Sequence, residues 1–121
     1  MDWELSIQNT DGSFPGHFGE AGSKPVIFNT GQIMHGMIAG YLNFQHDECL
    51  EAAVNAGKWM LLQQDEDGCW RRSVHNDTPH TYNTRAAWAL LRTGLIANKK
   101  DMADAAINNI RWALTLQTPS G

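Results

Sequence analysis

The chain has 121 residues, of which 42% are hydrophobic, and this length and composition indicate one domain spanning residues 1–121. Its net charge is −4 and its nine Lys and Arg residues form no basic run, so a nucleic-acid partner is not expected. No apolar stretch reaches the roughly 18 residues of a membrane span, no signal peptide is visible, and the two cysteines make no disulfide framework. We therefore expect a soluble, cytoplasmic protein without a metal or cofactor.

One sequence motif occurs at the start of the chain, again in its middle and, in part, near its end. In each copy a tryptophan is followed by leucine two residues later and by glutamine five residues later, at Trp3–Gln8, Trp59–Gln64 and Trp112–Gln117. The first two copies continue into an Asp-Gly-x-aromatic turn, at Asp11–Phe14 and Asp67–Trp70. Self-similarity at a nearly fixed period is the signature of a repeat protein.

A second set of matches predicts two helical hairpins. Phe28-Asn29-Thr30 matches Tyr82-Asn83-Thr84, and residues 48–59 match residues 101–112. Asn or Thr is a favoured N-cap, so we expect each triplet to begin a helix. The expected helices span 30–44, 47–63, 82–96 and 101–117, in two repeats of approximately 9–64 and 65–117. This pattern predicts an all-α fold.

The four expected helices differ in where their apolar residues fall. The first and third are apolar on most sides, which predicts that they lie inside. The second and fourth carry one apolar stripe and are expected to face outward. The expected stripes consist of Leu50, Val54, Gly57 and Leu61, and of Ala106, Ile107, Ile110 and Leu114. The long connections 9–27 and 65–81 lead to the starts of the inner helices, and long connections are often functional.

The residues of the repeated turn favour a structural role. The amides of Gln8, Gln64 and Gln117 offer donors and an acceptor to unpaired backbone groups at a helix end. Gly12 and Gly68 can adopt the positive φ that a chain reversal needs. Asp11 and Asp67 favour the turn that precedes each glycine. We therefore interpret each copy as a clamp that recurs because the structural unit recurs.

The Gln-x-x-Asp-Gly-x-aromatic phrase, at Gln8–Phe14 and Gln64–Trp70, resembles the repeat motif of squalene and oxidosqualene cyclases. This resemblance implies an α/α toroid, a fold that protein prenyltransferase β-subunits and several carbohydrate-active enzymes share. It also implies that the glutamine ties a helix end to neighbouring backbone and that the aromatic residue packs under the next helix. The segment HTYNTRAAWALLRTG, residues 80–94, is similar to bacterial toroid proteins linked to polysaccharide biosynthesis.

A closed toroid of this kind needs more hairpins than the two found here. We therefore expect a fragment-like portion of an incomplete α/α toroid, with apolar flanks left uncovered. Uncovered apolar surface marks contacts, so we expect copies of the chain to associate with one another.

Polar residues near the starts of the inner helices form the candidate ligand site. Helix N-termini suit anionic or hydroxyl-rich ligands, and a tryptophan can provide a stacking surface. The candidate ligand-binding residues are Gln32, His35, His80, Tyr82, Arg85 and Trp88, with His35 and Arg85 as candidates for catalysis. The competing interpretation makes Asn29 and Asn83 caps only, Tyr82 and Trp88 core only, and His35 a satisfied buried histidine.

Two further candidates are weaker. The resemblance to cyclases draws attention to Asp65, Glu66 and Asp67, but the cyclase Asp-x-Asp-Asp motif is absent and Asp67 has a structural counterpart in Asp11. The resemblance to prenyltransferases draws attention to zinc, but the spacing of Cys69, His75, Asp77 and His80 matches no standard ligand pattern.

Two functions remain open from the sequence. In one, the chain is part of a toroid protein that binds a sugar, polysaccharide or isoprenoid at the inner-helix N-terminal face. In the other, it is a non-catalytic helical repeat module for assembly or protein binding. The sequence does not decide whether the protein is an enzyme.

Overall fold

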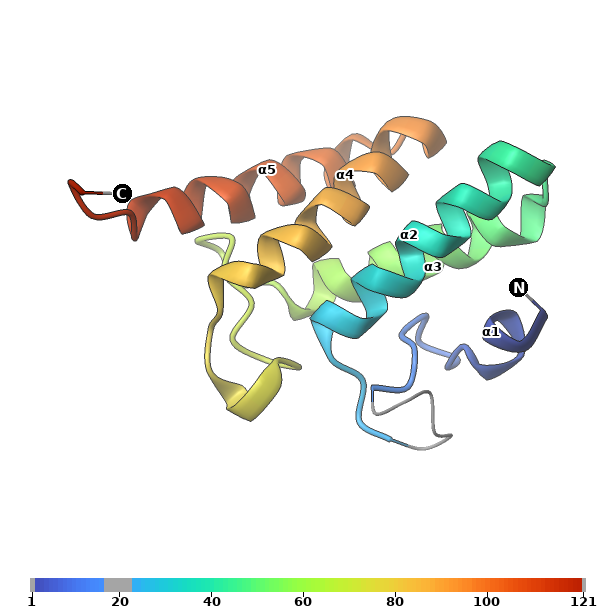
Figure 1. The fold of residues 1–121 in the computed structure, drawn as a ribbon, viewed down its shortest axis with the longest axis horizontal. Helices are drawn as coiled ribbons and strands as arrows, with labels where there is room; N and C mark the ends of the chain where they lie inside the picture. Colours follow the sequence, from blue (N-terminus) through green and yellow to red (C-terminus); the bar gives the residue numbers. More distant parts are fainter. Residues whose placement is uncertain (1, 17–22, 121) are drawn as a thin grey trace.

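The computed structural model describes residues 2–16 and 23–120, and within them the regular structure is helical, without strands (Figure 1). This confirms the expected all-α class. The five helices are α1 (Asp2–Ile7), α2 (Ile27–Phe44), α3 (Asp47–Gln63), α4 (Thr84–Ala97) and α5 (Lys100–Thr115). Two short 3-10 turns, η1 (His75–Asp77) and η2 (Thr81–Asn83), lie before α4. None of the helices described has the length and apolar character that crossing a bilayer requires.

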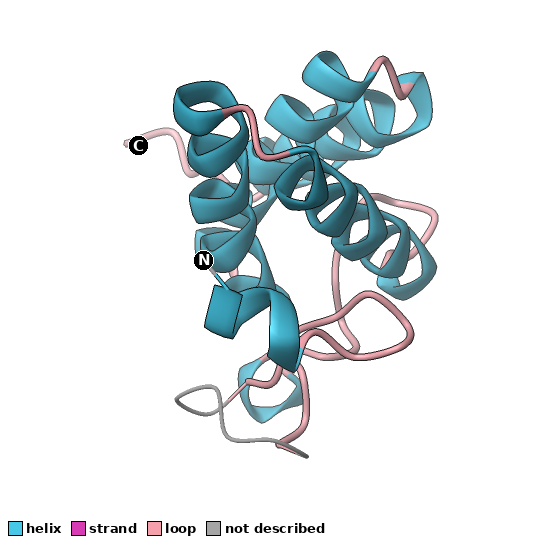
Figure 2. Cartoon of the chain, turned by 90° about the vertical axis from the view of Figure 1, so that its right-hand side faces the viewer, coloured by secondary structure: helices cyan, strands magenta, loops and turns pink. Residues whose placement is uncertain are grey.

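The four long helices form two hairpins in two layers. α2 and α4 pack side by side, α3 packs behind α2, and α5 packs behind α4 (Figure 1). The short links within the hairpins lie at one end of the molecule, and the longer segments that lead into α2 and α4 lie at the other (Figure 2). This arrangement matches the inner and outer pairing that the sequence predicts.

Small residues bring the helices close together. A Cβ atom added to Gly31 of α2 would lie 2.7 Å from the Cα of Ala86 in α4, so the two inner helices pack backbone against backbone at this point. Gly57 of α3 instead makes room for the side chains of Leu90 in α4 and Met102 in α5. Alanines and methionines fill much of the remaining core: Met34, Met37, Ala52, Ala53, Ala56, Met60, Ala87, Ala89, Ala105 and Ala106 are all buried.

The expected apolar stripes of the outer helices are partly wrong. The residues of α3 that are buried most deeply include Cys49, Ala53 and Met60, whereas Leu50 and Leu61 lie at the edge of the contact. In α5, Ile107 and Leu114 are exposed. The physical reason is that small side chains permit the close helix approach, so the large aliphatic residues lie beside the contact.

The inner helices are covered on one side only. Their buried residues face α3 and α5, but Leu42, Trp88 and Leu95 are exposed on the remaining surface. The expectation that α2 and α4 are enclosed on most sides is therefore wrong for this surface. A single row of two hairpins provides no second layer there.

The predicted asparagine and threonine caps are wrong for α2, and for α4 only the position of Asn83 is right. Val26 occupies the N-cap of α2 and makes no side-chain capping bond, while Asn29 lies within the helix and donates to the Gly16 carbonyl. Asn83 occupies the N-cap of α4 but makes no capping bond either. The Ile27 N–H donates instead to the Ser73 carbonyl at 2.7 Å, so a neighbouring loop satisfies a backbone group that a cap would otherwise serve.

The turn after α3 is joined to α5 by its glutamine. The Gln64 Nε2 donates to the Gly68 carbonyl at 3.0 Å and to the Ala105 carbonyl at 2.9 Å. The Cys69 N–H donates to Asp67 Oδ1 at 3.1 Å. Gly68 has φ +93°, and an added Cβ would lie 2.4 Å from the Asn108 carbonyl oxygen, so only glycine fits here.

The turn after α1 makes the corresponding contacts. The Gln8 Nε2 donates to the Gly12 and Ala52 carbonyls, both at 2.9 Å. The Ser13 N–H donates to Asp11 Oδ1 at 3.0 Å, and Gly12 has φ +96°. An added Cβ on Gly12 would lie 2.1 Å from the carbonyl oxygen of Asn55, the residue that matches Asn108 in the sequence repeat. The two turns are therefore equivalent in the hydrogen bonds of their glutamine and aspartate to backbone groups, and in the positive φ of their glycine.

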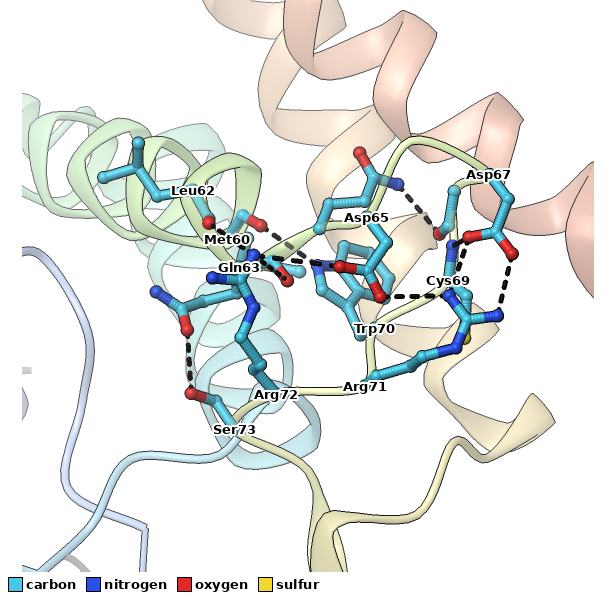
Figure 3. Close-up of polar contacts among 12 residues, drawn as sticks. Met60, Leu62, Gln63, Asp65, Asp67, Cys69, Trp70, Arg71, Arg72 and Ser73 are labelled. Carbon is cyan, nitrogen blue, oxygen red and sulfur yellow. Dashed lines mark hydrogen bonds and ion pairs between the residues drawn. The ribbon is translucent and has the colours of Figure 1, made fainter.

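The aromatic residue that ends each turn is buried in the core. Phe14 is 0% exposed and Trp70 is 1% exposed. The Trp70 indole N–H donates to the Met60 carbonyl at 3.0 Å, close to the end of α3 (Figure 3). The indole thus contributes both apolar packing and a partner for a helix-end carbonyl.

Replacing Trp70 by alanine should lower the free energy of unfolding by about 3 kcal/mol, because it leaves a large cavity beneath α3. The matched control is Trp88→Ala, which removes the same side chain from a position that is 52% exposed and should cost less than about 1 kcal/mol. Chemical denaturation followed by circular dichroism measures both values. Equal losses for the two variants would contradict the packing role assigned to Trp70.

Candidate functional site

The open face of α2 and α4 carries four of the six predicted ligand-binding residues. Gln32 and His35 belong to α2, and Arg85 and Trp88 belong to α4. Arg85 Nε donates to Gln32 Oε1 at 2.9 Å, and His35 Nε2 lies 3.3 Å from the Arg85 carbonyl oxygen. Residues about fifty positions apart in the sequence are thus brought into direct contact.

Arg92 completes this cluster, and the sequence analysis missed it. Its Nη1 lies 3.2 Å from His35 Nδ1, and its guanidinium lies 5.9 Å from the centre of the Trp88 ring. The His35 and Trp88 rings lie 4.8 Å apart. A signal was available, since Arg92 follows Trp88 by four residues and Arg85 by seven, which places all three on one helix face.

The hydrogen bonds of His35 fix its protonation. A guanidinium can only donate, so Nδ1 must accept from Arg92 and carries no proton. Nε2 therefore carries the proton and donates to the Arg85 carbonyl. Burial lowers the pKa of His35 below its ordinary value of 6.5, the bond to the Arg85 carbonyl opposes this shift, and the charges of Arg92 and Arg85 lower the pKa further. His35 is therefore a neutral imidazole at pH 7.

The cluster presents positive charge that no carboxylate of the described chain neutralises. The ion pairs found within residues 2–16 and 23–120 involve Lys24, Arg71, Arg72 and Lys100, and neither Arg85 nor Arg92 belongs to one. The net charge of the whole chain is −4, so this face differs in sign from the average of the molecule. Two guanidinium groups beside a half-exposed indole suit an anionic ligand with a flat apolar side.

A cavity of about 280 Å³ adjoins the cluster at Gln32. Ile33, Gly36 and Met37 of α2 line it together with Glu4 of α1. Gly36 is exposed, and a Cβ added there would meet nothing within 4 Å, so this part of α2 is open. The cavity therefore provides room for a ligand group next to the Gln32 amide.

His80 and Tyr82 form a separate group before α4. Their rings stack at 4.5 Å with an interplanar angle of 8°, and the Tyr82 ring meets Phe28 edge-on at 5.3 Å. Tyr82 also lines a cavity of about 180 Å³ with Asn83, whose buried Oδ1 has no hydrogen-bond partner among the described residues. The interpretation of Tyr82 and Trp88 as core residues is wrong, because both are exposed.

The acidic residues after α3 belong to the turn. The Arg71 guanidinium bonds to Asp65 Oδ2 at 2.9 Å and to both carboxylate oxygens of Asp67, at 3.0 and 2.8 Å (Figure 3). The bonds from Arg71, followed by the Cys69 N–H, lower the pKa of Asp67 to about 2. Asp67 is therefore ionised at neutral pH and engaged within the turn. Within the described residues, no group of three or more His, Cys, Asp or Glu side chains is placed to hold a metal ion.

The chain matches no protein-family model, no curated protein and no solved structure. The resemblance to toroid proteins therefore stands on the repeated turns and hairpins of this chain alone.

Titration by nuclear magnetic resonance should place the pKa of His35 below 6.5, the ordinary value. Because the unfolded chain binds the proton more readily, the contribution of His35 to stability is full above pH 6.5 and declines as the pH falls toward the lowered pKa. Arg92→Gln should raise the pKa of His35 by removing a nearby positive charge, whereas Arg111→Gln, on the exposed side of α5, should not change it. If the pKa of His35 were the same in the Arg92→Gln variant as in the original chain, the contact between the two residues would be contradicted.

Proposed function

We propose that this chain is part of an α/α toroid repeat protein and that the open face of its inner helices binds an acidic sugar or polysaccharide. The equivalence of the Gln8 and Gln64 turns, contact by contact, supports the repeat assignment. In a toroid, the layer formed by α2 and α4 would line the central cavity. The ligand-binding face defined by Gln32, His35, Arg85, Trp88 and Arg92 would then point toward that cavity.

The environment of the Trp88 indole is the observation that supports an acidic sugar as the ligand. The indole is half exposed and adjoins both the His35 ring and the Arg92 guanidinium. An indole face packs well against the apolar C–H side of a sugar ring. Arg92 and Arg85 would bind a carboxylate or phosphate on that ring, and the Gln32 amide would bind its hydroxyl groups.

The same geometry favours binding over catalysis. Both ring nitrogens of His35 are already hydrogen-bonded, Nδ1 to Arg92 and Nε2 to the Arg85 carbonyl. A general base needs a free lone pair directed at the substrate, and His35 offers none in this arrangement. The proposal therefore assigns recognition to this face and assigns no reaction to His35 or Arg85.

A second candidate is a repeat module for assembly, with copies of the chain as partners. It is favoured by exposed apolar side chains near the short links of the hairpins, at Leu42, Phe44 and Leu95. Exposed apolar groups of this kind mark contact surfaces. This candidate requires association between chains and no ligand on the Trp88 face.

Calorimetric titration with uronic-acid oligosaccharides, neutral oligosaccharides and a prenyl diphosphate separates these possibilities. We expect the acidic sugars to bind most tightly, and Trp88→Ala and Arg92→Gln each to weaken that binding at least tenfold, or about 1.4 kcal/mol. Trp3→Ala is the matched control, because Trp3 is 57% exposed on α1 and is not part of the cluster.

If the chain bound the prenyl diphosphate most tightly, the ligand would be an isoprenoid and not a sugar. If the chain bound none of these ligands and sedimentation showed that it associates with itself, the assembly module would be favoured. Unchanged affinity in the Trp88 variant would contradict the proposed site.

A further inference from the structure

A groove of about 590 Å³ lies between the segment that leads into α4 and the end of α5. Thr81 and Tyr82 line one side, and Ala113, Leu114, Leu116 and Gln117 line the other. Leu114 and Leu116 are 60% and 54% exposed, and Gln117 is exposed as well. Apolar side chains are thus left open at the end of the second hairpin.

The sequence repeat identifies the counterpart of this groove in the first hairpin. Residues of α5 match those of α3 at an offset of 53, and Tyr82 matches Phe28 at an offset of 54. These six of the eight lining positions therefore correspond to Ile27, Phe28, Met60, Leu61, Gln63 and Gln64. The two grooves occupy equivalent places, between the end of an outer helix and the start of its inner partner.

In the first hairpin the following turn fills this place. The Trp70 indole N–H donates to the Met60 carbonyl at 3.0 Å, and Ser73 Oγ donates to Gln63 Oε1 at 3.0 Å (Figure 3). The Ser73 carbonyl accepts from the Ile27 N–H at 2.7 Å. One segment thus bridges both walls, and Met60 becomes completely buried.

Basic and amide groups of the same segment add to this contact. Arg72 Nη2 lies 3.2 Å from the Leu62 carbonyl oxygen and 3.3 Å from that of Gln63, at the end of α3. Gln64 closes the turn by donating to the Gly68 carbonyl. In the second hairpin, the corresponding carbonyls belong to Ala113, Thr115 and Leu116, and the corresponding amide belongs to Gln117.

We propose that the groove at the end of α5 is the docking site of a further repeat turn. This turn would follow Gln117 in the way that Asp65–Val74 follows Gln64. The occupant is an Asp-Gly-x-aromatic turn whose aromatic ring enters between Tyr82 and Ala113. An indole in this position would donate to the Ala113 carbonyl, and a basic residue two positions later would reach the carbonyls of Thr115 and Leu116. The surface is therefore a docking site for a next hairpin of the same kind, and it is distinct from the Trp88 face.

The alignment of residues 117–121 with the second copy of the motif supports a repeat turn as the occupant. Gln117-Thr118-Pro119-Ser120-Gly121 aligns with Gln64-Asp65-Glu66-Asp67-Gly68, with glutamine and glycine in the same places. Ala113 replaces the larger Met60 in the wall, so the groove has room for a side chain as large as tryptophan.

A graft tests this proposal directly. Residues 118–121 are replaced by the ten-residue sequence of Asp65–Val74, so that the copied turn follows Gln117. We expect the thermal midpoint to rise by about 5 °C. We also expect the fluorescence of the added tryptophan to be shifted to the blue and to resist quenching by acrylamide, as for a buried indole.

Two matched variants show whether the groove is responsible. A graft with alanine in place of its tryptophan should lose the gain in midpoint. Ala113→Arg should abolish the gain in the grafted chain while leaving the midpoint of the original chain unchanged, because Ala113 is only half-buried there.

An added tryptophan that is exposed and brings no gain would overturn the proposal. So would a gain that persists with Ala113→Arg. The original chain could instead form a dimer that Leu116→Asp dissociates, while the graft has no effect. A second copy would then be the occupant, and the proposal would be wrong. The docking site rests on the proposed repeat architecture, but none of these outcomes depends on ligand binding at Trp88, so the two can fail separately.

Discussion

The glutamine amides at the ends of α1 and α3 are the interaction on which the rest of the structure depends. Each amide has two N–H groups and uses both, one for the carbonyl of its own glycine turn and one for a carbonyl in the outer helix of the following hairpin. Each unit is thereby fixed to the next through backbone atoms. In the second turn, Asn109 Nδ2 donates a further bond to the Gly68 carbonyl at 2.8 Å.

The clamp after α3 also determines what lies on the open face. By fixing the end of α3 to α5, it sets the position of α4, which then packs against α2 at Gly31 and Ala86. This contact places Arg92 beside His35, 57 residues away in the sequence. The ligand-binding face is thus a product of the repeat geometry, since His35 lies in the first hairpin and its neighbours Trp88 and Arg92 lie in the second.

The sequence predicts the helices and the turns because both depend on local chemistry. The 3.6-residue period marks the helices, and glutamine, aspartate and glycine at fixed spacing mark a turn with positive φ. The start of α2 at Ile27 differs from the expected start because a tertiary bond from Ile27 to Ser73 replaces the expected cap. Helix spacing places Arg92 on one face with Arg85 and Trp88, but its contact with His35 and the separate stacking of His80 on Tyr82 depend on tertiary packing.

The most direct measurement of the central claim compares alanine variants at the three matched glutamines. Gln8→Ala and Gln64→Ala each remove two hydrogen bonds to part-buried carbonyls and should lower the free energy of unfolding by about 1–3 kcal/mol. Gln117→Ala changes the same residue type at the same place in the repeat, but Gln117 is exposed and has no further hairpin to clamp within the described chain. Its change should stay within about 0.5 kcal/mol. A loss at Gln117 equal to that at Gln64, or no loss at Gln64, would contradict the account.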